Sequence, residues 1–164
     1  MIRGTIFDLE GTLIKLPIDY NTLHENIRKE LQLTKVRPLT KTVKTLSEES
    51  RMKMYRLWEK AELKALPFAS ANEEGMKLYR EFSSKPMALV TMQGKNIVER
   101  ILETFQLFFR IRITREDCFD RAGQILKAIN EMHLDPSSVL MIGDRENDRT
   151  ATRKIGCDFI KVKT

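Results

Sequence analysis

The sequence has little of what marks several common classes of protein. It holds two cysteines, Cys118 and Cys157, which lie far apart and have no second cysteine or histidine at ligand spacing. Neither a zinc site nor a disulfide framework is therefore predicted. No stretch approaches the roughly 18 consecutive apolar residues of a membrane span, and the N-terminus lacks the long apolar segment of a signal peptide. We expect a cytoplasmic protein with reduced thiols and no membrane partner.

Glycines and aromatic residues are also sparse. None of the 7 glycines belongs to the G-x-G-x-x-G pattern that a dinucleotide-binding protein places after its first strand. The aromatic residues, 7% of the total, are not interleaved with basic residues as they are in a surface that stacks nucleic-acid bases. The first feature disfavours a dinucleotide-binding protein, and the second disfavours nucleic acid as a partner. With 164 residues, 41% of them hydrophobic, the chain is long enough for one substantial core.

Positive charge is in excess, with 29 Lys and Arg against 23 Asp and Glu. Residues 16–70 carry most of the net charge of +6, and their basic residues are interspersed with acidic ones. This arrangement is typical of a solvated helix surface. It also suits contacts between a few of these cations and a phosphorylated partner.

The first half of the chain contains a block in which apolar residues recur at helical spacing. This block covers residues 19–66, is flanked by prolines, and includes the apolar positions Met54 and Trp58, which we expect to form packing contacts. Ser47, followed by two glutamates, is a start signal for the longest of its helices. The whole block is predicted to be helical.

Outside this block the pattern alternates between strand and helix. The predicted strands are residues 2–8, 87–91, 111–114, 138–143 and 158–162. The predicted helices are residues 72–82, capped by Asn72, and residues 95–107, 121–133 and 146–156. Such alternation implies a parallel sheet with helices on both faces.

Acidic, basic and hydroxyl side chains gather where the predicted strands end. These residues are Asp8, Glu10, Thr91, Arg121, Asp144 and Asp148. Each alone is typical of a turn or a helix cap. In an open parallel sheet, however, ligands bind beyond the carboxyl ends of the strands, and four acids at that edge would repel one another unless a cation lay among them. Mg²⁺ is the cation that such hard oxygen ligands suit.

This combination of motifs resembles a known superfamily. DLEGT at residues 8–12, Thr91, a cation before the fourth strand and GDRENDRTA at residues 143–151 are similar to the four motifs of the haloacid dehalogenase (HAD) superfamily, mostly Mg²⁺-dependent phosphohydrolases. The resemblance covers essentially the whole chain. LPIDYNTLHENIRKEL and ITRED are similar to sequences of phosphoglycolate-phosphatase-like members.

The resemblance implies an α/β fold with two parts. A Rossmann-like, three-layer core with a five-stranded parallel sheet, in the order 3-2-1-4-5, would comprise residues 1–16 and 68–164. Residues 17–67 would form a small, all-helical C1-type cap, inserted after the first strand. The cap would exclude water and contact the leaving group, and would open and close about linkers at Leu16 and Pro67.

The resemblance also implies a role for each candidate site residue. Asp8 would attack phosphorus and form an aspartyl-phosphate, and Glu10 would protonate the leaving oxygen and then accept a proton from water; the catalytic set is Asp8, Glu10, Thr91 and Arg121. Mg²⁺ would be held by Asp8, Glu10, Asp144 and Asp148. Phosphate would be bound by Gly11, Thr91, Met92, Lys95 and Arg121.

Two positions depart from the usual motifs. Glu10 stands where the superfamily usually has Asp, and Arg121 where it usually has Lys. Enolase-phosphatase-like members carry the same DxEGT pattern, so Glu10 is compatible with turnover. Lys95 and Lys127 are alternatives to Arg121 as the cation that neutralises phosphate.

Three functions remain open at this level. The first is a Mg²⁺-dependent phosphatase for a small organic phosphate monoester. The second is a nucleotide or polynucleotide-end phosphatase, which predicts salt-sensitive binding to oligonucleotides. The third is a non-catalytic HAD-like binding protein, which predicts no Mg²⁺-dependent hydrolysis of any phosphate ester.

Overall fold

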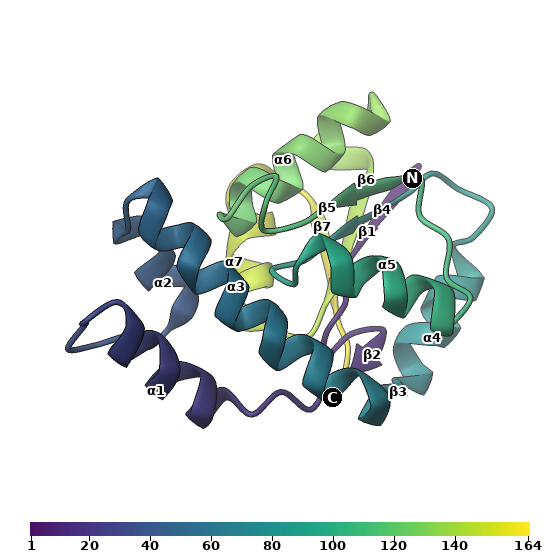
Figure 1. Ribbon diagram of the computed structural model, residues 1–164. Coiled ribbons are helices and arrows are strands. Elements are labelled where there is room, and N and C mark those ends of the chain that lie inside the picture. The colour runs from purple at the N-terminus through teal and green to yellow at the C-terminus, as the bar shows by residue number, and fades with distance from the viewer.

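A five-stranded parallel sheet forms the centre of the protein, as seen in a computed structural model that describes residues 1–164 (Figure 1). Its strands are β1 (Gly4–Phe7), β4 (Met87–Val90), β5 (Ile111–Ile113), β6 (Val139–Gly143) and β7 (Asp158–Lys161). Their order is β5-β4-β1-β6-β7, and all neighbours are parallel. The predicted order 3-2-1-4-5 is thus confirmed, and each strand lies within the range expected from the sequence.

Helices cover both faces of the sheet. They are α4 (Glu73–Glu81) and α5 (Lys95–Thr104) on one face, and α6 (Arg121–Met132) and α7 (Glu146–Ile155) on the other. Because side chains alternate along a strand, Phe7 of β1 packs in the cluster that includes α5, whereas Ile6 packs in the cluster that includes α6. A 3₁₀ turn, η3 (Pro136–Ser138), precedes β6.

The insert between β1 and α4 is helical, as predicted. Its helices are α1 (Tyr20–Glu30), α2 (Leu39–Thr42), η1 (Val43–Thr45), α3 (Glu48–Ala65) and η2 (Leu66–Phe68). Ser47 caps α3 by accepting a hydrogen bond from the Ser50 N–H. The division of the chain into a core and a cap stays a prediction.

A small antiparallel ribbon stands at the base of the insert. It consists of β2 (Ile14–Lys15) and β3 (Ser70–Ala71), and it joins the outgoing and returning chain. Two-residue strands have no readable period, so the sequence did not predict them. Asn72 precedes α4, as predicted, but its side chain makes no capping hydrogen bond to that helix. It donates instead to the carbonyl oxygens of Gly11 and Lys163.

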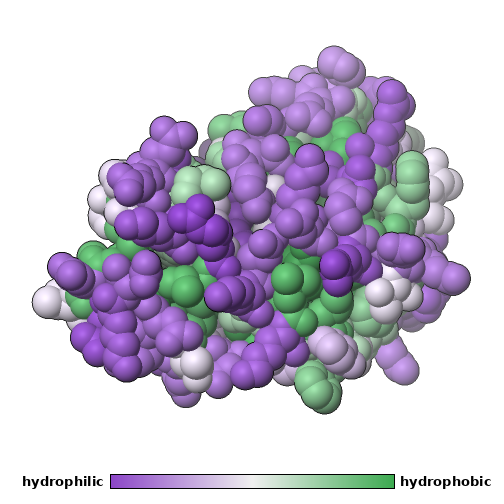
Figure 2. Space-filling model, viewed as in Figure 1, coloured by the Kyte–Doolittle hydropathy of each residue, from purple (hydrophilic) through white to green (hydrophobic).

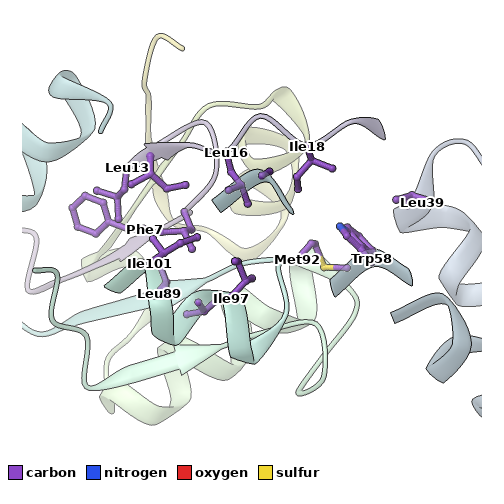
Figure 3. Packing of buried hydrophobic residues seen from close by; sticks show 14 of the residues in the cluster. Phe7, Leu13, Leu16, Ile18, Leu39, Trp58, Leu89, Met92, Ile97 and Ile101 are labelled. Carbon is purple, nitrogen blue, oxygen red and sulfur yellow. The ribbon is translucent and has the colours of Figure 1, made fainter. Parts of the chain in front are cut away.

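The insert and the sheet share one hydrophobic core. A cluster of 26 buried residues includes Phe7 and Leu89 of the sheet together with Met54 and Trp58 of α3, and Figure 3 shows Trp58 and Met92 at one end of it. The packing role expected for Met54 and Trp58 is confirmed. Figure 2 shows hydrophilic residues over most of one face of the molecule, and no helix has the length and apolar character that crossing a membrane requires.

Candidate functional site

Three aspartates converge at the carboxyl edge of the sheet. Asp8 directly follows β1, Asp144 directly follows β6, and Asp148 lies in the first turn of α7. One carboxylate oxygen from each lies within 4.8 Å of the others. Asp8 and Asp148 are buried, and Asp144 is partly exposed. Residues more than 130 positions apart in sequence thus form a single cluster of oxygen atoms.

Arg121 brings a positive charge next to two of these aspartates. It is the first residue of α6, whose N-terminus is capped by Asp120. Its Nη2 lies 3.1 Å from Asp8 Oδ1, and its Nε lies 3.1 Å from Asp148 Oδ1. The other two cations considered, Lys95 and Lys127, are exposed and do not line the cavity described below.

The carboxylates carry more negative charge than Arg121 offsets. Burial and the neighbouring Asp8 raise the pKa of Asp144 above its usual range. Burial, with a smaller contribution from Asp8, raises the pKa of Asp148 to about 6, although the Arg121 guanidinium acts in the opposite direction. Such shifts reflect like charges held together in a poorly solvated place. A divalent cation among these oxygens would relieve this repulsion.

Glu10 lies beside the cluster and lines the same cavity. Burial and the charge of Asp8 raise the pKa of Glu10 to about 7. Arg145, for which the sequence predicted no role, is also near Glu10, and its Nη2 lies 3.8 Å from Glu10 Oε2. A carboxyl group with a pKa near neutrality can both donate and accept a proton at physiological pH.

Gly11 makes the turn after Glu10 and lies beside the Asp144 carboxylate. Its φ of +84° lies in the left-handed region that favours glycine. A Cβ at this position would lie 2.3 Å from Asp144 Oδ2. The hydroxyl of the next residue, Thr12, is 3.4 Å from Asp144 Oδ1. Gly11 does not line the cavity. The space that a side chain at this position would need is occupied by the Asp144 carboxylate.

The segment after β4 presents one free backbone donor. The Gln93 N–H donates to Thr91 Oγ1 at 3.1 Å, and the Thr91 carbonyl accepts from Gln124 Nε2 at 2.8 Å. The Met92 N–H has no acceptor within the protein, and Met92 lines the cavity together with Thr91. An unpaired backbone donor in such a place suits an anion.

A cavity of about 550 Å³ connects these groups with the insert. The sheet edge contributes Asp8, Glu10, Thr91, Met92, Arg121, Arg145 and Asp148. The insert contributes residues that include Tyr20, His24, Arg37, Leu39, Lys41, Lys44 and Trp58. The volume is that of a typical small-molecule site.

Two further charged residues lie behind the cavity wall and were missed at the sequence level. Glu62 of α3 and Arg115, two residues after β5, form a buried ion pair with distances of 2.8 and 2.9 Å. Glu62 lies four positions after Trp58 in the helix and therefore on the same, apolar face. An acidic residue on that face was the signal from which a buried charge could have been predicted. Nothing in the sequence identified Arg115 as its partner.

Comparison with family models gives one match over almost the whole chain. The model for haloacid dehalogenase-like hydrolases matches residues 5–162. A search of curated proteins found no match.

Solved structures show the same fold at low sequence identity. A haloacid dehalogenase-like family hydrolase from Streptococcus pneumoniae is 21% identical, with a TM-score of 0.71 over 98% of this chain and 84% of that one. A hydrolase from Pseudomonas syringae is 17% identical, with a TM-score of 0.76 over 96% and 82%. A protein described as a predicted phosphoglycolate phosphatase from Haemophilus somnus is 17% identical, with a TM-score of 0.67 over 98% and 84%.

Proposed function

Because the chain belongs to the haloacid dehalogenase-like hydrolases, we propose that it is a Mg²⁺-dependent phosphatase that hydrolyses a small organic phosphate monoester. The observation that carries this proposal is the cluster of Asp8, Asp144 and Asp148 carboxylates, of which Asp8 and Asp148 line the cavity. Arg121 and the free Met92 N–H lie at the same cavity. The site therefore combines a nucleophile, a place for a cation and donors for phosphate oxygens.

Asp8 is the nucleophile in this proposal. Its carboxylate attacks the phosphorus atom, the bond from phosphorus to the leaving oxygen breaks, and an aspartyl-phosphate forms. Glu10 gives its proton to the leaving oxygen. Water then attacks the phosphorus of the aspartyl-phosphate, Glu10 accepts a proton from that water, and inorganic phosphate leaves while the Asp8 carboxylate is restored.

The remaining residues bind the phosphoryl group. Thr91 and the Met92 N–H would donate to its oxygens, and Arg121 would offset its negative charge. Phosphoryl transfer depends mainly on such positioning and charge stabilisation. Lys95 has the same predicted role but lies outside the cavity lining, so its contribution would require a change in its position.

The donor set fits Mg²⁺, because three aspartates offer hard oxygen ligands within one small volume. Asp8 and Asp144 would bind the ion directly, with the Glu10 carbonyl and Asp148 assisting. The bound ion would supply electrostatic stabilisation to phosphoryl oxygens.

Residues 17–67 would serve as the cap. Their side chains line the cavity opposite the carboxylates, where the leaving group of a bound ester would lie. This placement supports a role in excluding water and selecting the substrate. The name of the Haemophilus somnus neighbour makes phosphoglycolate one substrate worth testing.

A phosphate-release screen tests the proposal. Phosphoglycolate, sugar phosphates and nucleotides would be assayed with Mg²⁺ and with a chelator, using the parent, Asp8→Asn and, as a control, Asp158→Asn at the opposite end of the sheet. We expect Mg²⁺-dependent release that Asp8→Asn lowers by about 10³-fold or more. If no ester releases phosphate, the proposed phosphatase activity is wrong. If Asp8→Asn releases phosphate as fast as the parent, the assignment of Asp8 as the nucleophile is wrong.

A further inference from the structure

The pair formed by Glu62 and Arg115 is fully enclosed. The side chain of Glu62 is 0% exposed and that of Arg115 is 1% exposed. The Arg115 guanidinium lies 4.5 Å from the centre of the Trp58 ring and 5.1 Å from that of Tyr55. The Tyr55 hydroxyl donates to the Arg115 carbonyl at 3.1 Å. The insert and the segment after β5 are therefore joined by direct contacts between buried groups.

Stability alone is a weak reason for such a pair. Removing two charges from water is costly, and apolar residues of similar volume often stabilise a protein equally well or better. Burial raises the pKa of Glu62 to about 7 even though Arg115 acts in the opposite direction. The hydrogen bonds of the pair point to another role.

Both side chains hold the backbone of the segment that follows Thr91. The Gly94 N–H donates to Glu62 Oε2 at 3.1 Å, and Arg115 Nη1 donates to the Met92 carbonyl at 3.3 Å. The Arg115 N–H also lies 3.5 Å from the Gln93 carbonyl. The side chains of the pair thus bond to Met92 and Gly94, and the Arg115 backbone bonds to Gln93 between them. The Met92 N–H, the free donor of this segment, belongs to the backbone that these contacts hold, and Met92 lines the cavity.

We propose that Glu62 and Arg115 are positioning residues of the phosphate site, which fix the Met92–Gly94 backbone so that the Met92 N–H is presented to the phosphoryl group. This inference rests on the proposed function for the identity of the anion. It makes helix α3 of the insert a fixed part of the phosphate site. Any opening of the insert that moves α3 would then release the phosphate-binding backbone as well.

The test separates positioning from stability. The double variant Glu62→Met/Arg115→Met keeps a similar side-chain volume and removes the side-chain hydrogen bonds to the Gly94 N–H and the Met92 carbonyl, while the bond from the Arg115 N–H to the Gln93 carbonyl remains. Glu62→Gln keeps an acceptor for the Gly94 N–H. The matched control is Glu99→Met/Arg112→Met, which removes an exposed ion pair of 2.8 Å between α5 and β5. Binding of inorganic phosphate with Mg²⁺ would be measured by calorimetry, alongside amide exchange at Gly94 and the Tm.

We expect the Glu62→Met/Arg115→Met protein to bind phosphate about 10-fold more weakly or worse, and its Gly94 amide to exchange faster. Glu62→Gln should lose less affinity, and the control should match the parent. Parent-like affinity and Gly94 exchange in a folded double variant would overturn the proposal. If the double variant does not fold, Glu62→Met alone, which removes the acceptor for the Gly94 N–H, replaces it, and parent-like affinity and Gly94 exchange in that variant overturn the proposal. If the parent binds no phosphate, the proposed function fails, and Gly94 exchange alone decides the positioning role.

Discussion

At the scale of single residues, the site depends on side chains whose chemistry is set by their neighbours. Burial and Asp8 raise the pKa of Glu10 to about 7, so its carboxyl group is partly protonated at neutral pH. Glu10 therefore suits the two proton transfers assigned to it, even though the superfamily usually has Asp here. Its carboxylate lies 3.8 Å from the Arg145 guanidinium, and both residues line the cavity.

Glu10→Gln should lower kcat by about 10²- to 10⁴-fold with an alkyl phosphate. In the parent, kcat/KM should fall as pH rises through about 7, because the protonated Glu10 is needed for departure of the leaving group. This decrease in kcat/KM with rising pH should be absent from Glu10→Gln. Glu10→Asp, which keeps a carboxyl group, is the control. An unchanged pH profile in Glu10→Gln would contradict the proton-transfer role.

Gly11→Ala tests the turn beside Asp144. The new Cβ would require an unfavourable φ and would also lie 2.3 Å from Asp144 Oδ2. Gly156→Ala is the matched control, because its φ is +96° but nothing lies within 4 Å. We expect the control to lose about 1 kcal/mol of folding stability and Gly11→Ala to lose more. Mg²⁺ affinity should become about 10-fold weaker in Gly11→Ala and should stay unchanged in the control. Equal behaviour of the two variants would show that the contact with Asp144 is unimportant.

At the scale of secondary-structure elements, the insert is packed as part of the same core as the sheet. Trp58 of α3 belongs to the cluster that contains Phe7 of β1 and Ile97 of α5. The Glu62–Arg115 pair adds a polar link between α3 and the segment after β5. A shared core of this kind predicts that the insert and the sheet unfold together.

The single tryptophan makes this cooperativity measurable. Thermal unfolding followed by Trp58 fluorescence should coincide with unfolding followed by far-ultraviolet circular dichroism. Trp58→Phe should lower the Tm of the whole protein, because a large core side chain is lost on the shared interface. A fluorescence transition at a clearly lower temperature than the dichroism transition would show that the insert unfolds by itself.

The sequence predicted most elements but few of the contacts between them. The polar residues at strand ends follow from periodicity and from motifs that lie within short segments, whereas the strand order was implied by the resemblance to the haloacid dehalogenase superfamily. The Glu62–Arg115 pair could not be predicted, because its members are 53 positions apart and meet only when α3 packs on the core. Asn72 was expected to cap a helix from its local position, yet its side chain bonds to Gly11 and Lys163.

At the scale of the whole molecule, the fold brings together carboxylates that are far apart in the chain. Asp8 and Asp144 meet because β1 and β6 are parallel neighbours with Phe7 opposite Ile142. The C-terminal ends of both strands consequently reach the same edge of the sheet. Asp158 is paired with Leu140, at the start of β7, and lies toward the opposite edge. Topology therefore decides which aspartates can share an ion.

Titration calorimetry with Mg²⁺ tests this arrangement most directly. We expect the parent to bind one ion per chain, Asp8→Asn and Asp144→Asn each to weaken binding by about 10-fold or more, and Asp158→Asn to bind as the parent does. Absence of binding by the parent, or parent-like binding by both Asp8→Asn and Asp144→Asn, would contradict a metal site shared between β1 and β6.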